Sequence, residues 1–210
     1  MTKPTNKIAY HHGDLRAALL RAGFELLESG EPFSLRAVAR QASVSTAAPY
    51  RHFADREELE SALAVQGMQD LLAALQTSAG ADGTGGGGAE FAVAYVRFAM
   101  SRPALFQLMF GRPCNDQDDE RVRAASALHE YLDTAIVEAL PAGAPAGAAT
   151  AGWALAHGLA FLHLDGKLPN ADPAEIDARI RETFRAAFPA GHADRAVGTQ
   201  TKSNTKDLSA

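Results

Sequence analysis

The chain has 210 residues, 47% of them hydrophobic, which suffices for one ordinary domain or for a small domain fused to a larger one. The single cysteine, Cys114, excludes an internal disulfide bond, and the first residues lack an apolar run of signal-peptide length, so we expect a cytoplasmic protein. The net charge of −5 is uneven, because residues 1–53 carry seven basic and four acidic side chains. A basic segment on an acidic body is expected when only that segment meets phosphate.

The first part of the chain predicts four helices. Apolar residues at helical spacing indicate a helix from about Asp14 to Gly30. Ser34 is a natural N-cap for a short second helix, and Ser45 for a short third helix that runs to about Phe53. Asp55, with a glutamate three residues later, forms a capping box that opens a long fourth helix.

The rest of the chain predicts five more helices after a glycine-rich linker. The linker covers residues 79–88, and the helices cover about 89–101, 103–111, 118–140, 145–165 and 173–188. Runs of alternating β-branched residues are absent, so we expect an all-α protein. The predicted organisation is a three-helix helix-turn-helix domain with its N-terminal arm (1–54), a connecting helix with a C-terminal helical bundle (55–188) and a disordered tail (189–210).

An uncharged stretch from Ala139 to Leu164 is long enough to span a bilayer. Its first half is rich in proline, glycine and alanine, and its second half contains His157 and His163. A membrane-spanning helix would hold more Leu, Ile, Val and Phe. We therefore expect a buried helix in this stretch, and no membrane association.

Residues 33–63 have the pattern of a helix-turn-helix, in which two short helices are joined by a tight turn. The second helix of such a motif can lie in the major groove of DNA, where base edges are distinguishable. Small and hydroxyl-bearing residues, which suit close approach, are followed by the longer Tyr50, Arg51 and His52. Alternatively, Tyr50 and His52 pack on neighbouring helices.

The motif V-S-x4-Y-x-H-F at residues 44–53, the polar residues after it, and F-S-L-R-x-V-A-R at residues 33–40 together resemble the TetR family of repressors. The resemblance implies that three N-terminal helices bind DNA, that the fourth connects, and that a helical body dimerises and binds a ligand. By position, Arg36 resembles a base or phosphate contact, Thr46 and Ala47 base-reading residues, and Tyr50 and His52 phosphate anchors. The complete predicted DNA-binding set is Ser34, Arg36, Ser45, Thr46, Ala47, Tyr50, Arg51, His52 and Arg56.

Two positions depart from the family pattern. Ser43 stands where the family usually has a glycine, because the turn favours a left-handed backbone; a serine there costs on the order of 1 kcal/mol or distorts the turn. Pro49 lies inside the predicted third helix, where its missing N–H removes a hydrogen bond to the Ser45 carbonyl.

A second resemblance lies in the body, where W-x3-H-G at residues 153–158 is similar to the signature of one C-terminal subgroup of these repressors, as is Y-H-H-G-D-L at residues 10–15. Trp153 and His157 share one helix face and form either part of a ligand pocket or a hydrogen-bonded core pair. Tyr95 and Met100 are further candidates for the pocket wall. The predicted ligand-binding set is Phe98, Phe106, Met109, Phe110, Trp153, His157 and Phe161.

We find no phosphate-binding glycine loop, nucleophile elbow or paired cysteines, and therefore expect no enzyme, no catalytic residue, no cofactor and no metal site. Adjacent His11 and His12 lack further ligands. We expect a homodimeric repressor that binds double-stranded DNA at a palindromic operator and is released by a small hydrophobic effector. The alternative is a DNA-binding regulator without a small-molecule ligand, controlled by a protein partner or by its level. A small-molecule enzyme is the third possibility.

Small residues of the predicted 145–165 helix suggest a close helix–helix contact in the dimer, formed with residues 173–188. These residues are Ala148, Ala149, Ala151, Gly152, Ala156 and Ala160. Gly158 is expected to let a neighbouring helix approach.

Overall fold

The computed structural model describes residues 12–80, 88–111, 120–139, 146–169 and 172–189. Within these ranges the chain forms eight α-helices, one 3-10 helix and no strand, so the predicted all-α fold is confirmed. The elements are α1 (His12–Ser29), α2 (Leu35–Gln41), η1 (Pro49–Arg51), α3 (Arg56–Gly80), α4 (Gly88–Ser101), α5 (Pro103–Phe110), α6 (Glu120–Ala139), α7 (Ala148–Leu164) and α8 (Pro173–Ala187). The predicted disordered tail after residue 189, most of the linker, Cys114 and His11 lie outside the described residues.

Local capping explains where several helices begin. The Ser34 hydroxyl accepts a hydrogen bond of 3.1 Å from the Ala37 N–H and caps α2. Asp55 accepts one of 2.9 Å from the Glu58 N–H, while the Glu58 carboxylate accepts one of 2.6 Å from the Ala54 N–H. These two bonds form the predicted capping box, except that the glutamate accepts from the N–H of Ala54 instead of from that of Asp55.

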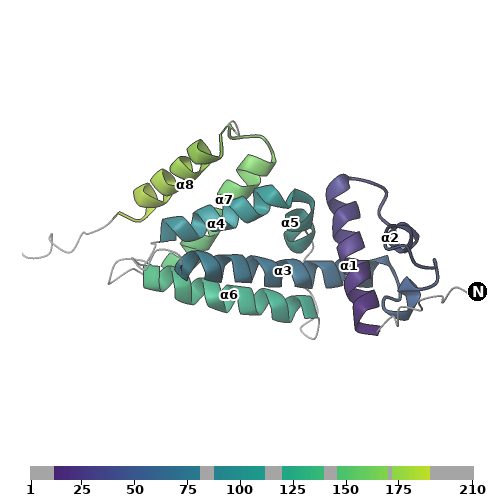
Figure 1. Ribbon diagram of the computed structural model, residues 1–210. Coiled ribbons are helices and arrows are strands. Elements are labelled where there is room, and N and C mark those ends of the chain that lie inside the picture. The colour runs from purple at the N-terminus through teal and green to yellow at the C-terminus, as the bar shows by residue number, and fades with distance from the viewer. Residues whose placement is uncertain (1–11, 81–87, 112–119, 140–145, 170–171, 190–210) are drawn as a thin grey trace, which may run out of the picture.

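The helices form a small head at one end of a longer body (Figure 1). The head consists of α1, α2 and η1, and α3 runs from it through the body. In the body, α6 lies along α3, α4 packs between α3 and α7, and α8 covers α4. The short α5 lies where the head meets the body and contacts α1, α3 and α4.

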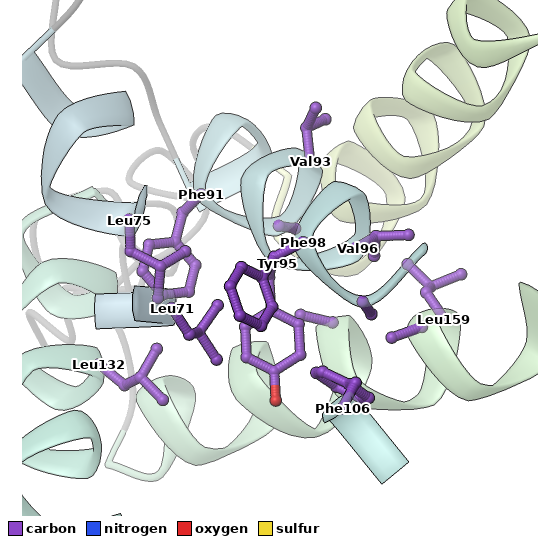
Figure 2. Close-up of a cluster of buried hydrophobic side chains, with 14 of the residues drawn as sticks. Leu71, Leu75, Phe91, Val93, Tyr95, Val96, Phe98, Phe106, Leu132 and Leu159 are labelled. Atoms are coloured by element: carbon purple, nitrogen blue, oxygen red, sulfur yellow. The ribbon is translucent and has the colours of Figure 1, made fainter. Parts of the chain in front are cut away.

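Two hydrophobic cores meet on α3. The head core contains Leu19 and Val38 together with Leu59 and Leu63 from the first turns of α3. The body core continues along the same helix with Met68, Leu71 and Leu75, and Figure 2 shows the last two close to Leu132 and Phe91. A single helix therefore supplies buried residues to both cores.

The small residues of α7 mainly serve the body core of their own protomer. Ala148, Gly152, Ala156 and Ala160 are buried, whereas Ala151 is exposed. The expectation that Gly158 admits a neighbouring helix is wrong within this chain, because no heavy atom lies within 4 Å of the position where its Cβ would be. In the described part of the chain, no helix is both long and apolar enough to cross a membrane.

Candidate functional site

The turn between α2 and η1 has the left-handed backbone that the family resemblance implied. Ser43 has φ of 56°, and it is the one described non-glycine residue with a positive φ. The Val44 N–H donates to the Ala39 carbonyl at 2.9 Å, which closes the end of α2. A side chain in this conformation clashes with its own backbone, so Ser43 adds local strain.

The element after this turn is shorter than predicted. The expected α-helix from Ser45 to Phe53 is wrong, because the structure has a turn followed by the 3-10 helix η1. The Ser45 carbonyl accepts a hydrogen bond of 2.9 Å from Ala48, three residues later, instead of from residue 49. Pro49 has no N–H to complete the α-helical bond, which explains the tighter winding.

Most of the predicted DNA-binding residues lie exposed on the head. Tyr50 is one of two exposed large hydrophobic residues in the described chain, with 52% of its surface accessible. A large side chain with half of its surface exposed suits a contact with another molecule. The other exposed members of the set are Ser34, Arg36, Ser45, Thr46, Ala47, Arg51 and Arg56.

Three residues of the set have additional roles or constraints. The Ser34 oxygen already accepts the α2 cap, so its O–H remains as a donor for phosphate. The Arg56 guanidinium donates to Glu60 at 2.6 Å and lies 5.4 Å from the centre of the Phe33 ring. His52 is half-buried, and its buried Nε2 has no hydrogen-bond partner among the described residues. Because this nitrogen is buried, a phosphate could reach it only after a local rearrangement.

A second candidate site lies in the body, where aromatic rings surround His157. The His157 ring centre lies 4.8 Å from that of Phe110, 4.9 Å from Phe161 and 5.7 Å from Phe106. We call these four residues, with Tyr95 and Trp153, the aromatic cluster. Its members come from α4, α5 and α7, and His129 of α6 lies 5.4 Å from Trp153 at its edge.

A chain of hydrogen bonds runs through the aromatic cluster. Trp153 Nε1 donates to the Tyr95 hydroxyl at 3.3 Å, and this hydroxyl lies 2.9 Å from His157 Nδ1. Figure 2 shows Tyr95 among apolar side chains. Burial raises the pKa of Tyr95 well above its usual range, and burial lowers the pKa of His157. Both groups are therefore neutral near pH 7.

The aromatic cluster unites five residues of the predicted ligand-binding set, namely Phe106, Phe110, Trp153, His157 and Phe161. Two other members lie elsewhere. Phe98 is buried in the body core without a ring contact to the cluster, and Met109 faces α3, where a Cβ on Gly67 would lie 2.8 Å from its Sδ. Tyr95, which the sequence indicated only as a further wall candidate, is central to the hydrogen bonding.

Contacts that sequence analysis missed connect α5 to the head. The Glu28 carboxylate of α1 accepts hydrogen bonds from the Ala104 and Leu105 N–H groups, at 3.2 and 3.0 Å, at the start of α5. Arg102 donates to Asp70 of α3 at 2.8 Å and lies 4.5 Å from the centre of the Phe24 ring of α1. These residues are separated by up to 78 positions, so no local pattern could have identified the pairs.

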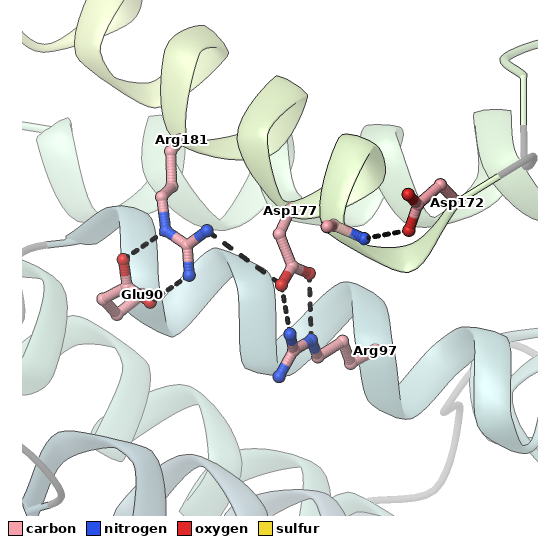
Figure 3. Close-up of polar contacts among 6 residues, drawn as sticks. Glu90, Arg97, Asp172, Asp177 and Arg181 are labelled. Atoms are coloured by element: carbon pink, nitrogen blue, oxygen red, sulfur yellow. Dashed lines mark hydrogen bonds and ion pairs between the residues drawn. The ribbon is translucent and has the colours of Figure 1, made fainter.

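Ion pairs fix α8 on α4 (Figure 3). Arg97 donates two hydrogen bonds to the Asp177 carboxylate, whose side chain is only 6% exposed. Arg181 donates to both oxygens of Glu90, at 2.6 and 2.9 Å. The hydrogen bond from Arg181 lowers the pKa of Glu90, against the effect of its burial. These pairs hold the last described helix in register with α4.

Comparison with solved structures gives neighbours of the same fold. A protein of unknown function from Rhodococcus sp. RHA1 is 33% identical, with a TM-score of 0.70 over 87% of this chain and 99% of that one. A regulatory protein of the TetR family from Rhodococcus RHA1 is 20% identical, with a TM-score of 0.58 over 83% of this chain and 96% of that one. The multidrug binding protein EbrR, complexed with imidazole, is 17% identical, with a TM-score of 0.61 over 91% and 100%.

Comparison with curated proteins finds no match. A family model for the C-terminal domain of tetracyclin repressor-like proteins matches residues 89–194, about half of the chain. This match covers the helices that carry the aromatic cluster, and the helix-turn-helix pattern lies outside it. The structure has a helical head and an all-α body, as the resemblance implied, although the third element of the head is the 3-10 helix η1. The chain belongs to the TetR family of transcriptional regulators.

Proposed function

We propose that the protein is a homodimeric repressor that binds a near-palindromic operator and leaves it when a small apolar effector enters the body. The observation that carries this proposal is the position of α5. Phe106 and Phe110 of this helix contact the aromatic cluster, and its first N–H groups are bound by Glu28 of α1. One short helix therefore connects the candidate ligand site with the candidate DNA-binding head.

The effector can act only through different affinities for two conformations. Entry of a ligand among Phe106, Phe110 and Phe161 requires these rings to separate, because their centres now lie 4.8 to 5.6 Å apart. Movement of α5 would be transmitted to α1 through Glu28 and to α3 through Leu105, which lies against Gly67. The two heads of a dimer would then no longer match successive major grooves.

The dimer is supported by the exposed face of α7. Leu162 is 44% exposed, and Ala151, Ala154 and Gly158 are exposed on the same helix. Because four of the six small residues in the sequence argument are buried within the protomer, this face replaces them as the candidate contact, with α8 beside it. Two-fold symmetry would present two heads to two half-sites. Action on DNA places the proposed function in the cytoplasm.

The alternative, regulation without a small molecule, is favoured by the close ring contacts of the aromatic cluster. Four cavities of about 210 to 320 Å³ lie away from the cluster among the described residues, for example the groove between α3 and α6 at Met68 and Ala124. One neighbour of this fold is a multidrug binding protein, which supports a ligand site for the present chain.

The test is fluorescence anisotropy with labelled duplexes from the region upstream of the protein's own gene. We expect specific binding, dimeric stoichiometry by sedimentation, and release by members of a panel of apolar aromatic compounds. Binding without release by any compound would favour the alternative. A stable monomer at micromolar concentration, or no preference over scrambled duplex, would contradict the proposed function.

A further inference from the structure

The hydrogen bonds in the aromatic cluster determine which nitrogen of His157 carries a proton. An indole N–H can only donate, so the Tyr95 oxygen accepts from Trp153 at 3.3 Å. The single hydroxyl proton of Tyr95 needs an acceptor of its own, and among the described residues that acceptor is His157 Nδ1, at 2.9 Å. The opposite arrangement would leave a buried hydroxyl proton unpaired, which costs free energy.

Because Nδ1 accepts, the neutral imidazole carries its proton on Nε2. The lowered pKa of His157 is consistent with a neutral ring. No described residue accepts a hydrogen bond from Nε2, and the ring is half-buried, so this donor end is not sealed. The cluster thus holds one oriented N–H donor.

The described rings nearest to the imidazole of His157 belong to phenylalanines. Phe110, Phe161 and Phe106 lie around the ring at centre-to-centre distances of 4.8, 4.9 and 5.7 Å. No arginine or lysine takes part in the ring contacts of the cluster among the described residues. A charged carboxylate would therefore lose its hydration without gaining a cation, whereas a neutral acceptor would lose much less.

We propose that the aromatic cluster selects flat, neutral ligands that carry one hydrogen-bond acceptor, such as an aryl ketone, and that His157 Nε2–H recognises this acceptor. Trp153 and Tyr95 are positioning residues, because they fix the proton on Nε2. This inference rests on the proposed function for the entry of a ligand into the body, and it adds the polar group that an effector must contain.

The first experiment measures the tautomer in the intact chain without any ligand. Proton–nitrogen NMR of protein labelled with ¹⁵N-histidine should show His157, assigned by its loss in His157→Gln, protonated at Nε2. Tyr95→Phe removes the donor to Nδ1, so the preference for this tautomer should weaken. His129→Gln, which replaces the histidine beside Trp153, is the control and should leave the His157 signals unchanged. A proton on Nδ1 in the unmodified protein overturns the proposal.

The second experiment compares 2-acetylnaphthalene with 2-isopropenylnaphthalene, in which a CH₂ group replaces the carbonyl oxygen. Calorimetric titration should show the ketone binding about fivefold more tightly, the size expected for one net hydrogen bond. In His157→Phe the preference should disappear or reverse, while His129→Gln should retain it. Equal binding of the two probes to the unmodified protein, or binding of neither, overturns the proposal. This outcome does not depend on whether the variants fold.

Operator release is measured in parallel, so that the two proposals can fail separately. Preference for the ketone without release of DNA would support the acceptor site and contradict effector control. Release of DNA by both probes at equal concentrations would support effector control and overturn the role of His157 Nε2–H.

Discussion

The head and the body of this protein use their buried and exposed residues in opposite ways. The head core is built mainly from aliphatic side chains, such as Leu19 and Val38, and its candidate functional groups lie on the surface. The body has its candidate functional groups inside, where Tyr95 and His157 are hydrogen-bonded among aromatic rings. A surface that binds DNA needs side chains at fixed spacing along one short segment of the chain, whereas an internal site needs side chains from several helices.

The largest effect is expected in the body, where structure and proposed ligand site coincide. Phe106 is fully buried and contacts Tyr95, Phe110 and Phe161. Phe106→Ala should lower the free energy of unfolding by about 4 kcal/mol, because it removes a large side chain and leaves a cavity. Urea unfolding measures this loss, and Phe106→Leu should retain most of the stability. A loss below about 1 kcal/mol for the alanine variant would mean that the cluster is loosely packed.

In the head, Arg36→Ala should affect DNA binding and leave folding almost unchanged, whereas Arg56→Ala also removes one partner of the buried Glu60 carboxylate and should cost some stability. Arg36→Ala should weaken specific binding by about 1–3 kcal/mol and relax the preference at one base position. Arg56→Ala should weaken binding to all sequences. It should also reduce the slope of log affinity against log salt concentration by about one, which corresponds to one released ion. Isotherms on specific and scrambled duplexes decide this, with exposed Arg185→Ala of α8 as the control. The same loss of specificity from both substitutions would contradict the division into base and phosphate contacts.

Substitutions in the ion pair between α4 and α8 test how much a buried charge contributes to the stability of the body. Arg97→Ala leaves the Asp177 carboxylate buried, with Arg181 as its remaining ion-pair partner among the described residues, at 4.0 Å, and should cost about 2 kcal/mol. Asp177→Asn leaves Arg97 mostly in solvent, since 62% of its side chain is exposed, and should cost less than Arg97→Ala. Thermal unfolding of both variants measures the order. If the order is reversed, solvent reaches Asp177 more freely than the structure indicates.

Relief of backbone strain should stabilise the head. Ser43 has a left-handed backbone, so Ser43→Gly should raise the free energy of unfolding by up to about 1 kcal/mol. Ser45→Gly is the matched control, and it should not stabilise the protein, because Ser45 does not have a positive φ. Chemical unfolding distinguishes the two variants, and equal effects would contradict strain at residue 43.

The smallest effect is a pH dependence of stability that His157 contributes. Its pKa is lower in the folded chain than the ordinary value of 6.5, so between these two values the unfolded state binds more protons. The stability due to neutral His157 is complete above the ordinary value and decreases as the pH falls through the folded pKa. The stability of the wild type relative to His157→Gln should therefore be smaller at about pH 5.5 than at about pH 7.5. Phe161→Leu should show no such change relative to the wild type, and a constant difference for His157→Gln would contradict the assigned shift.

Sequence patterns predicted the features that depend on neighbouring residues. The caps at Ser34 and Asp55 are determined within a few residues, and both are confirmed, as is the left-handed turn at Ser43 that the family resemblance implied. The effect of Pro49 was foreseen in part, because its missing N–H was recognised but the resulting 3-10 helix was not.

The body was harder to predict because its helices are apolar on most sides. In α5, Phe106 faces the aromatic cluster and Met109 faces α3, and the sequence PALFQLMF does not distinguish the two faces. Trp153 and His157 could be paired from their spacing of four residues, but Tyr95 joins them from 58 positions away. Such partners are determined by helix packing, which one sequence does not reveal.

The continuity of α3 has a consequence for dissecting the protein. Leu59 and Leu63 complete the head core, although both follow the predicted boundary at residue 54. A fragment that ends at residue 54 would lack them and would expose the apolar sides of α1 and α2. A fragment that extends to about Gly67 would include both leucines. Amide hydrogens at the start of α3 should therefore exchange together with those of α1, and proteolysis within the first turns of α3 should release no folded head.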